Sequence, residues 1–333
     1  MLRQVLKKHL VRYPNQGFTL IELLVSMVMA GLIISGLMFL VVDLLRTDQR
    51  ELTLEQTQQD MKRALDYIAD DVREAIYVYD DPTPLVTNLA NTDYALPADA
   101  RPVLAFWKIK QLNVEAGDYS KLSTPGTAAC SGLGVDPFKR CQALLVRHGY
   151  YELVIYYSTD DADPEWEGEA RVYRYSVPEY SQDALTDPAT ALEENSIYVL
   201  DSGATPIQGG LPRSDWAWVP NDSGAGTFRG DVLVDFVASL AATPAPPACE
   251  TGTQVPAATA GVTASNSFYA CIRPIDASNN LLNQDVSIYL RGDADPTPTN
   301  SSLVLGGVSD NSELPTLQTR VLTRGVVNKD LPD

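Results

Sequence analysis

Residues 17–42 read GFTLIELLVSMVMAGLIISGLMFLVV, and they constrain what the rest of the chain can be. From residue 23 to residue 42 the stretch carries no charge. At about 1.5 Å per residue, a helix of this length spans roughly 30 Å, the thickness of a bilayer's hydrocarbon core. An ordinary secretory signal has a shorter apolar core and ends at a small-residue cleavage site. The stretch therefore predicts a membrane-spanning helix over residues 18–42.

Charge is unevenly distributed on the two sides of this predicted helix. Residues 1–17 contain four Lys or Arg residues and no Asp or Glu, whereas the 333-residue chain as a whole has a net charge of −18. Because basic flanks stay on the cytoplasmic side, we expect residues 1–17 in the cytoplasm and the acidic remainder outside it. A body this acidic repels phosphate backbones, which disfavours nucleic acid as a partner.

Glu22 is the unusual residue at the start of the apolar stretch. A carboxylate in a bilayer opposes insertion by up to about 3 kcal/mol, and an ionisable residue there indicates a function by default. A free α-amino group is largely cationic at neutral pH. Two opposite charges lower each other's cost of burial in surroundings of low dielectric constant. Glu22 is therefore suited to pair with such a cation.

Residues 17–25, GFTLIELLV, resemble the leader junction of type IV prepilins and pseudopilins. The resemblance implies that a prepilin peptidase removes the leader 1–17 by cutting between Gly17 and Phe18, and that it then methylates the amino group of Phe18. Glu22 becomes the fifth residue of the mature chain, where the family has a glutamate that engages the N-terminal amine of a neighbouring subunit. A plain signal anchor is the alternative, and it gives Gly17 and Glu22 no role.

The resemblance also implies partners. These are other pilins or pseudopilins, contacted through the N-terminal helix, and an inner-membrane assembly platform. The platform would need a separate ATPase, because the chain has no Walker A sequence. The sequence departs from many major pilins in one respect, since no proline lies between Phe18 and Asp80. Gly31 and Gly36 are the weak points of the helix instead, at roughly 1 kcal/mol each relative to Ala.

Beyond the apolar stretch, residues 43–78 are predicted to continue the helix in amphipathic form. Apolar residues recur there at steps of three and four: Leu54, Met61, Leu65, Ile68, Val72 and Ile76. A coiled coil is the alternative to a helix packed on its own globular head. Residues 61–75 resemble the helix of PilW-type minor pilins and J-type minor pseudopilins, and more loosely the pseudopilins of hormogonium polysaccharide secretion in cyanobacteria.

Residues 79–333 are predicted to form a β-rich globular head. The predicted strands are rich in Val, Ile, Tyr and Leu and are separated by turn-forming residues; they cover residues 102–109, 142–147, 152–157, 171–177, 196–200, 231–240, 267–273, 285–291 and 318–324. Strands that follow one long helix indicate an α+β fold with a mainly antiparallel sheet on the helix. Long loops are expected at 80–100, 201–230 and 241–266.

Four cysteines lie in the head and none in the apolar stretch. In an exported protein, the short loops between Cys130 and Cys141 and between Cys249 and Cys271 favour two local disulfides. Four cysteines allow three pairings, so the other connectivities stay open. No pair has the C-x2-4-C spacing of a zinc site.

The sequence of the head carries weak signals of chemistry. His148 is the one histidine outside the leader, and no G-x-S-x-G sequence supports a catalytic triad around it. The acidic run 160–169 has carboxylates at alternate positions, but it lacks the closing glutamate of a calcium loop. The pair Trp216 and Trp218 could form a ligand patch, although such a pair more often has one buried ring and one partly exposed ring. We therefore predict no catalytic residue, no metal and no cofactor.

These observations predict a minor pilin or pseudopilin that is assembled into a pilus or a secretion pseudopilus. The large head favours a minor component over a subunit packed along a whole filament. A ligand-binding or adhesion module at a filament tip is the alternative, and a membrane-anchored enzyme is a third.

Overall fold

A computed structural model describes residues 19–90, 94–111, 130, 135, 138, 141–142, 149–160, 165–166, 168–178, 198–200, 218–220, 230–241, 245, 247–257, 265–274, 283–294 and 315–323. The chain divides into two compact units, with the boundary between Thr53 and Leu54. Helix α1 (Leu20–Arg73) supplies residues to both units. The second unit begins inside the helix, so residues 54–73 of α1 belong to the head together with the residues that follow them.

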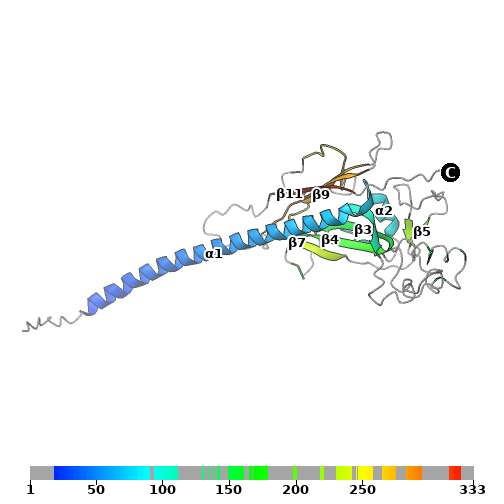
Figure 1. Ribbon diagram of the computed structural model, residues 1–333. Coiled ribbons are helices and arrows are strands. Elements are labelled where there is room, and N and C mark those ends of the chain that lie inside the picture. Colours follow the sequence, from blue (N-terminus) through cyan, green and yellow to red (C-terminus); the bar gives the residue numbers. More distant parts are fainter. Residues whose placement is uncertain are drawn as a thin grey trace, which may run out of the picture. The chain divides into compact units, whose positions relative to one another are not determined.

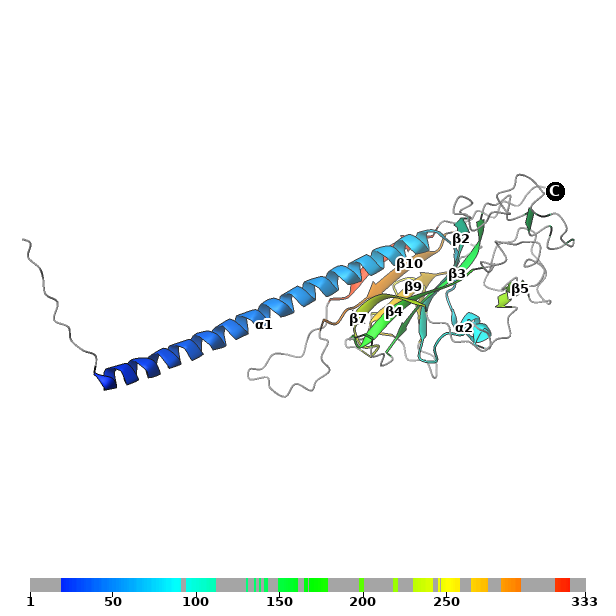
Figure 2. The same cartoon turned by 90° about the horizontal axis from the view of Figure 1, so that it is seen from below.

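The second unit contains two antiparallel sheets beside residues 54–73 of α1 (Figures 1 and 2). The first sheet has the order β1 (Ala75–Val78), β2 (Arg101–Gln111), β3 (Gly149–Thr159), β4 (Ala170–Pro178) and β7 (Asp231–Val237). The second has the order β11 (Leu317–Leu322), β10 (Asp285–Leu290), β9 (Phe268–Arg273) and β8 (Thr253–Val255). β5 (Tyr198–Leu200) pairs with β6 (Trp218–Pro220). The expected α+β fold with antiparallel sheets is confirmed.

One hydrophobic core lies between α1 and the facing sides of both sheets. The helix contributes a stripe at three- and four-residue steps, which puts these side chains on one face: Met61, Ala64, Leu65, Ile68 and Val72. The first sheet contributes Leu104 and Val154, and the second contributes Ala270 and Ile288. The apolar stripe read from the sequence is therefore the contact between helix and sheets.

A second core covers the opposite face of the first sheet. It is rich in aromatic side chains, including Trp107, Tyr157 and Tyr173, and it also contains Leu85 and Leu89 of helix α2 (Thr83–Leu89). β3 is buried at every position because both faces of the sheet are covered. Its near-continuous apolar sequence is typical of such a strand.

Backbone and side-chain hydrogen bonds join the two sheets at both ends. Gln284 accepts from the backbone N–H of Val78 at 2.7 Å and donates to the Val78 carbonyl at 2.6 Å. At the other end, Val237 of β7 forms a β-bridge with Gly292, and Ala238 N–H donates to the Arg291 carbonyl at 3.0 Å. The sheets are thus tied directly to each other as well as through the shared core.

Several sequence predictions need correction. Helix α1 ends at Arg73, not at residue 78, because residues 75–78 form β1 and pair with β2. The predicted loop 80–100 contains α2, and the loops 201–230 and 241–266 contain β6 and β8. β7 ends at Val237, not at residue 240. Gln142 is helical, so no strand begins there, and residues 143–147 lie outside the described residues.

Candidate functional site

Helix α1 begins with a local capping arrangement at Thr19. The backbone N–H of Glu22 donates to the Thr19 carbonyl at 3.0 Å and lies 3.4 Å from the Thr19 hydroxyl oxygen. Thr19 and Glu22 have the spacing of a capping box. A carboxylate in the first turn is stabilised by the helix dipole, by about 0.3–1 kcal/mol. Glu22 therefore helps to start the helix whether or not it binds a partner, a role that the sequence interpretation missed.

The first part of α1 exposes its apolar side chains. Residues Leu20–Leu45 have a mean hydropathy of 2.5, and none of this span is buried within the structure. Leu20 is 87% exposed, Phe39 is 73% exposed and Ile33 is 62% exposed. Exposed apolar area costs about 25 cal/mol per Å² in water. This helix is long and apolar enough to cross a membrane, and its surface needs lipid or other apolar helices around it.

The two serine hydroxyls in this apolar span are satisfied within the helix itself. The hydroxyl of Ser26 donates to the Leu23 carbonyl at 2.9 Å, and that of Ser35 donates to the Leu32 carbonyl at 3.2 Å. A surface in contact with hydrocarbon requires such internal bonds, since lipid offers none. Open space surrounds Gly31 and Gly36, where a second helix could approach closely.

In the head, Asp71 fixes the end of α1 to the first sheet. Its carboxylate accepts from Lys108 Nζ of β2 at 2.5 Å, from Tyr156 Oη of β3 at 2.6 Å and from Arg174 Nε of β4 at 2.8 Å. The side chain of Asp71 is only 7% exposed. One carboxylate therefore contacts three adjacent strands and sets the register of the helix on the sheet.

The ionisation of this cluster follows from its contacts. Burial alone would raise the pKa of Asp71, but hydrogen bonds from Arg174, Lys108 and Tyr156 outweigh it, and the pKa lies below its ordinary value. Burial would lower the pKa of Lys108, yet the bond to Asp71 and the nearby Glu152 hold it above its ordinary value. Asp71 thus stays charged among two cations. We infer a structural role for it, since three strong donors already occupy its oxygens.

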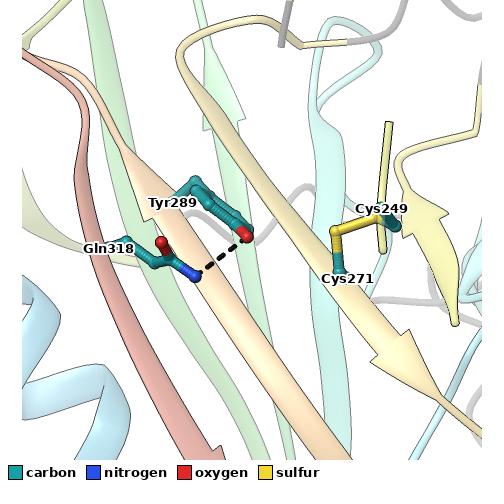
Figure 3. Close-up of a disulfide and its surroundings, with 4 residues drawn as sticks. All are labelled: Cys249, Cys271, Tyr289 and Gln318. Atoms are coloured by element: carbon teal, nitrogen blue, oxygen red, sulfur yellow. Dashed lines mark hydrogen bonds between the residues drawn. A yellow bond between two sulfur atoms is a disulfide. The ribbon is translucent and has the colours of Figure 1, made fainter. Parts of the chain in front are cut away.

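The outer face of the second sheet carries one of the two disulfides (Figure 3). Cys249 pairs with Cys271 of β9, with 5.7 Å between their Cα atoms, and Cys130 pairs with Cys141 at 5.8 Å. These are the two pairs favoured by the spacing. Beside the first, the rings of Tyr269 and Tyr289 stack with centroids 4.6 Å apart, and Gln318 Nε2 donates to Tyr289 Oη at 2.9 Å. The disulfide, the stacked rings and the hydrogen bond from Gln318 together stabilise this face of the sheet.

Other residues singled out by the sequence are only partly placed. Gly17, Phe18, His148 and Trp216 lie outside the described residues, as do five positions of the acidic run 160–169. Trp218 belongs to β6. Within the described part of the chain, no group of three or more His, Cys, Asp or Glu side chains is arranged to hold a metal ion.

Comparison with known proteins bears on the N-terminal part of the chain. Residues 12–38 match the prokaryotic N-terminal methylation motif. The matched residues include the predicted cut site and Glu22, and they reach Met38 within α1. The motif supports a protein of the type IV pilin or pseudopilin kind, anchored by its N-terminal helix, and it implies processing by prepilin peptidase and assembly with other pilins. No curated protein and no solved structure matches the chain.

Proposed function

We propose that this chain is a minor pilin or pseudopilin that is inserted in the inner membrane and then assembled into a type IV pilus or a type II-like secretion pseudopilus. The observation that carries the proposal is the methylation motif at residues 12–38, which runs directly into a helix whose apolar side chains are exposed. A subunit held by lipid before assembly and by neighbouring helices afterwards needs such a surface.

In this proposal the leader 1–17 stays in the cytoplasm and the head lies outside it. The basic leader favours that orientation, because Lys and Arg are retained on the cytoplasmic side. Two disulfides in the head agree with an oxidising compartment. The proposed partners are prepilin peptidase, other pilins or pseudopilins, and an inner-membrane platform driven by a separate ATPase.

We further propose that the subunit is a minor component. Its second unit begins at Leu54 and extends to Asp333, which is a large body for a subunit repeated along a whole filament. Immunogold labelling should then find sparse label or label near filament ends. Uniform label along every filament would contradict the minor role without affecting the pilin assignment.

Processing tests the assignment of the leader. Replacing Gly17 with Leu should leave an uncleaved precursor, because the peptidase is expected to need a residue without a Cβ atom at the cut. Gly31→Leu is the matched control, since a side chain there meets open space. It should be processed like the original chain. Normal processing of Gly17→Leu would contradict the prepilin interpretation.

A second experiment tests the role proposed for Glu22. Glu22→Val should preserve processing and membrane insertion but reduce incorporation into filaments, because the amine of the neighbouring subunit loses its counter-charge. Asp43→Val is the control, since it removes a carboxylate at the other end of the apolar span. Equal incorporation of the Glu22→Val variant and the original chain would refute amine pairing.

A further inference from the structure

The two disulfides of the head differ in how far a reagent can reach their sulfur atoms. Cys130 and Cys141 are both completely buried. Cys249 is partly exposed, whereas its partner Cys271 is only 6% exposed. Thiol–disulfide exchange begins when a thiolate attacks one sulfur of the bond, so its rate depends on access to that sulfur. In the folded head, exchange is therefore favoured at the Cys249–Cys271 bond and begins at Cys249.

The Cys249–Cys271 bond fastens residues 249–255, which we call the β8 segment, to β9. The antiparallel register of β8 and β9 places Gln254 opposite Cys271. Cys249, in the same segment, has its Cα atom 5.7 Å from that of Cys271 (Figure 3). The β8 segment thus meets Cys271 twice, once through strand pairing and once through a covalent bond.

A glycine turn makes this double contact possible. Gly252 has φ of 92°, in the left-handed region that L side chains rarely adopt. A Cβ atom at this position would lie 2.3 Å from the Ile272 carbonyl oxygen, so the turn passes directly against the backbone of β9. At the end of the segment, Val255 is buried in the core between α1 and the two sheets. The disulfide therefore holds the start of the β8 segment, and a core side chain holds its end.

The strand pairing within the β8 segment is short. β8 contains three residues, and so short a pairing is marginal by itself. A covalent link keeps the segment beside β9 whenever the pairing opens, so that the pairing closes again readily. Without the link, an opened segment can move away from β9. β8 and β9 both contact β2, so the state of this bond also affects the junction between the two sheets.

We propose that the Cys249–Cys271 bond is a site of thiol–disulfide exchange with a dithiol oxidoreductase, and that its redox state controls the pairing of β8. In the reducing direction, a thiolate of the enzyme bonds to Cys249 Sγ, the disulfide breaks, and Cys271 leaves as a thiolate that takes a proton from water. The enzyme's second thiolate then attacks the enzyme sulfur of the mixed disulfide. This step releases Cys249 as a thiolate and leaves the enzyme as a disulfide, so that two electrons pass to the head.

The reverse sequence forms the bond and returns the two electrons to an oxidised enzyme. The inference goes beyond the proposed assembly role, because it needs only the contacts of the head. Its failure would leave the N-terminal motif and the assembly proposal as they are.

The site of attack can be mapped on the full chain in detergent micelles. A short exposure to reduced glutathione is stopped with excess N-ethylmaleimide in urea, and the peptides are identified by mass spectrometry. We expect glutathione on Cys249, maleimide on Cys271, and cleavage of this bond at least about tenfold faster than that of Cys130–Cys141. Equal rates in the folded chain would overturn the proposal. Glutathione on Cys271 would overturn the assigned direction of attack.

A thioredoxin that lacks its second cysteine is the enzyme probe, because it forms the mixed disulfide and cannot resolve it. It should be trapped on Cys249 of the original chain. The variant Cys249→Ser should trap none, whereas Cys130→Ser/Cys141→Ser retains the proposed site and should be trapped like the original chain. A chain that reacts with glutathione but traps no thioredoxin would contradict an oxidoreductase as the partner.

Hydrogen exchange tests the effect on β8. In the variant Cys249→Ser/Cys271→Ser, the amides of β8 should exchange at least about tenfold faster than in the original chain, and those of β10 should not change. Cys130→Ser/Cys141→Ser is the matched control and should leave β8 protected. The original chain reduced with dithiothreitol gives the same comparison without a substitution. Equal exchange of β8 in the oxidised and reduced chains would overturn control of β8, and faster exchange in β10 as well would contradict a local effect.

Discussion

The two parts of helix α1 differ in the exposure of their apolar side chains. In Leu20–Leu45 the apolar residues are exposed, and none of the span is buried within the structure. In residues 54–73 the apolar residues form one stripe, and Ile68 and Val72 are completely buried. The first part therefore depends on surroundings outside the chain, whereas the second part supplies the chain's own core. The same secondary structure presents an apolar surface to its surroundings in one part and completes the core of the head in the other.

The largest expected effect comes from the ion cluster that holds the second part of the helix. Asp71→Asn removes the charge that balances Lys108 and Arg174 and leaves two partly buried cations facing a neutral amide. We expect it to lower the free energy of unfolding of the head by about 3–5 kcal/mol, the usual cost of breaking a buried pair. Urea unfolding followed by tryptophan fluorescence measures it. The neighbouring Asp70→Asn is the control, because Asp70 is exposed. Equal stability of the two variants would show that the contacts of the Asp71 carboxylate do not stabilise the head.

A matched pair of truncations tests the comparison directly. Ile68→Ala should lower the free energy of unfolding of the head by about 2–5 kcal/mol, since it leaves a cavity between helix and sheets. Ile33→Ala removes the same atoms from a side chain that is 62% exposed. It should change head stability by less than about 0.5 kcal/mol. The same urea titration in detergent compares them, and a similar loss in both would mean that residues 20–45 also pack within the chain.

A smaller effect is expected in the dependence of stability on pH. The pKa of Asp71 is lowered in the folded head, so its contribution is present above its ordinary unfolded value of 3.8 and is lost as pH falls through the folded value. Asp285 contributes to the same loss of stability at acid pH, because the hydrogen bond from Arg320 lowers its pKa. Asp71→Asn should reduce the slope of the free energy of unfolding against pH in this acid range by less than about 1.4 kcal/mol per pH unit. Unfolding titrations of both chains between about pH 2 and pH 6 measure this slope. An unchanged slope in the variant would contradict the prediction.

Local patterns predicted much of this molecule. The apolar run and the stripe at Met61, Leu65, Ile68 and Val72 are both local signals, and both parts of α1 followed from them. The end of the helix did not follow, because Ile76 continues the stripe by spacing but pairs as part of β1. Only the position of β2, more than twenty residues further along the chain, shows that a strand is favoured there.

The polar contacts were harder to predict. Asp71 lies three positions after Ile68, at the border of the apolar stripe, and a carboxylate in that place indicates a buried partner. Its partners Lys108, Tyr156 and Arg174 come from three strands whose register no local pattern reveals. A pocket lined by α1, residues 165–166 and β7 likewise combines Tyr67, Trp166 and Phe236 from distant segments. The sequence did carry a signal for α2, because Leu85 and Leu89 are four positions apart, and both side chains are buried in the second core.

The proposed processing leaves a methylated amine on Phe18, two positions before helix α1 begins at Leu20. The most direct test is the mass of the N-terminal peptide of the chain isolated from cell envelopes that contain a prepilin peptidase. We expect a peptide that begins at Phe18 and carries one methyl group on its amine. A chain that still begins at Met1, or that has been cut beyond the apolar span, would contradict the account.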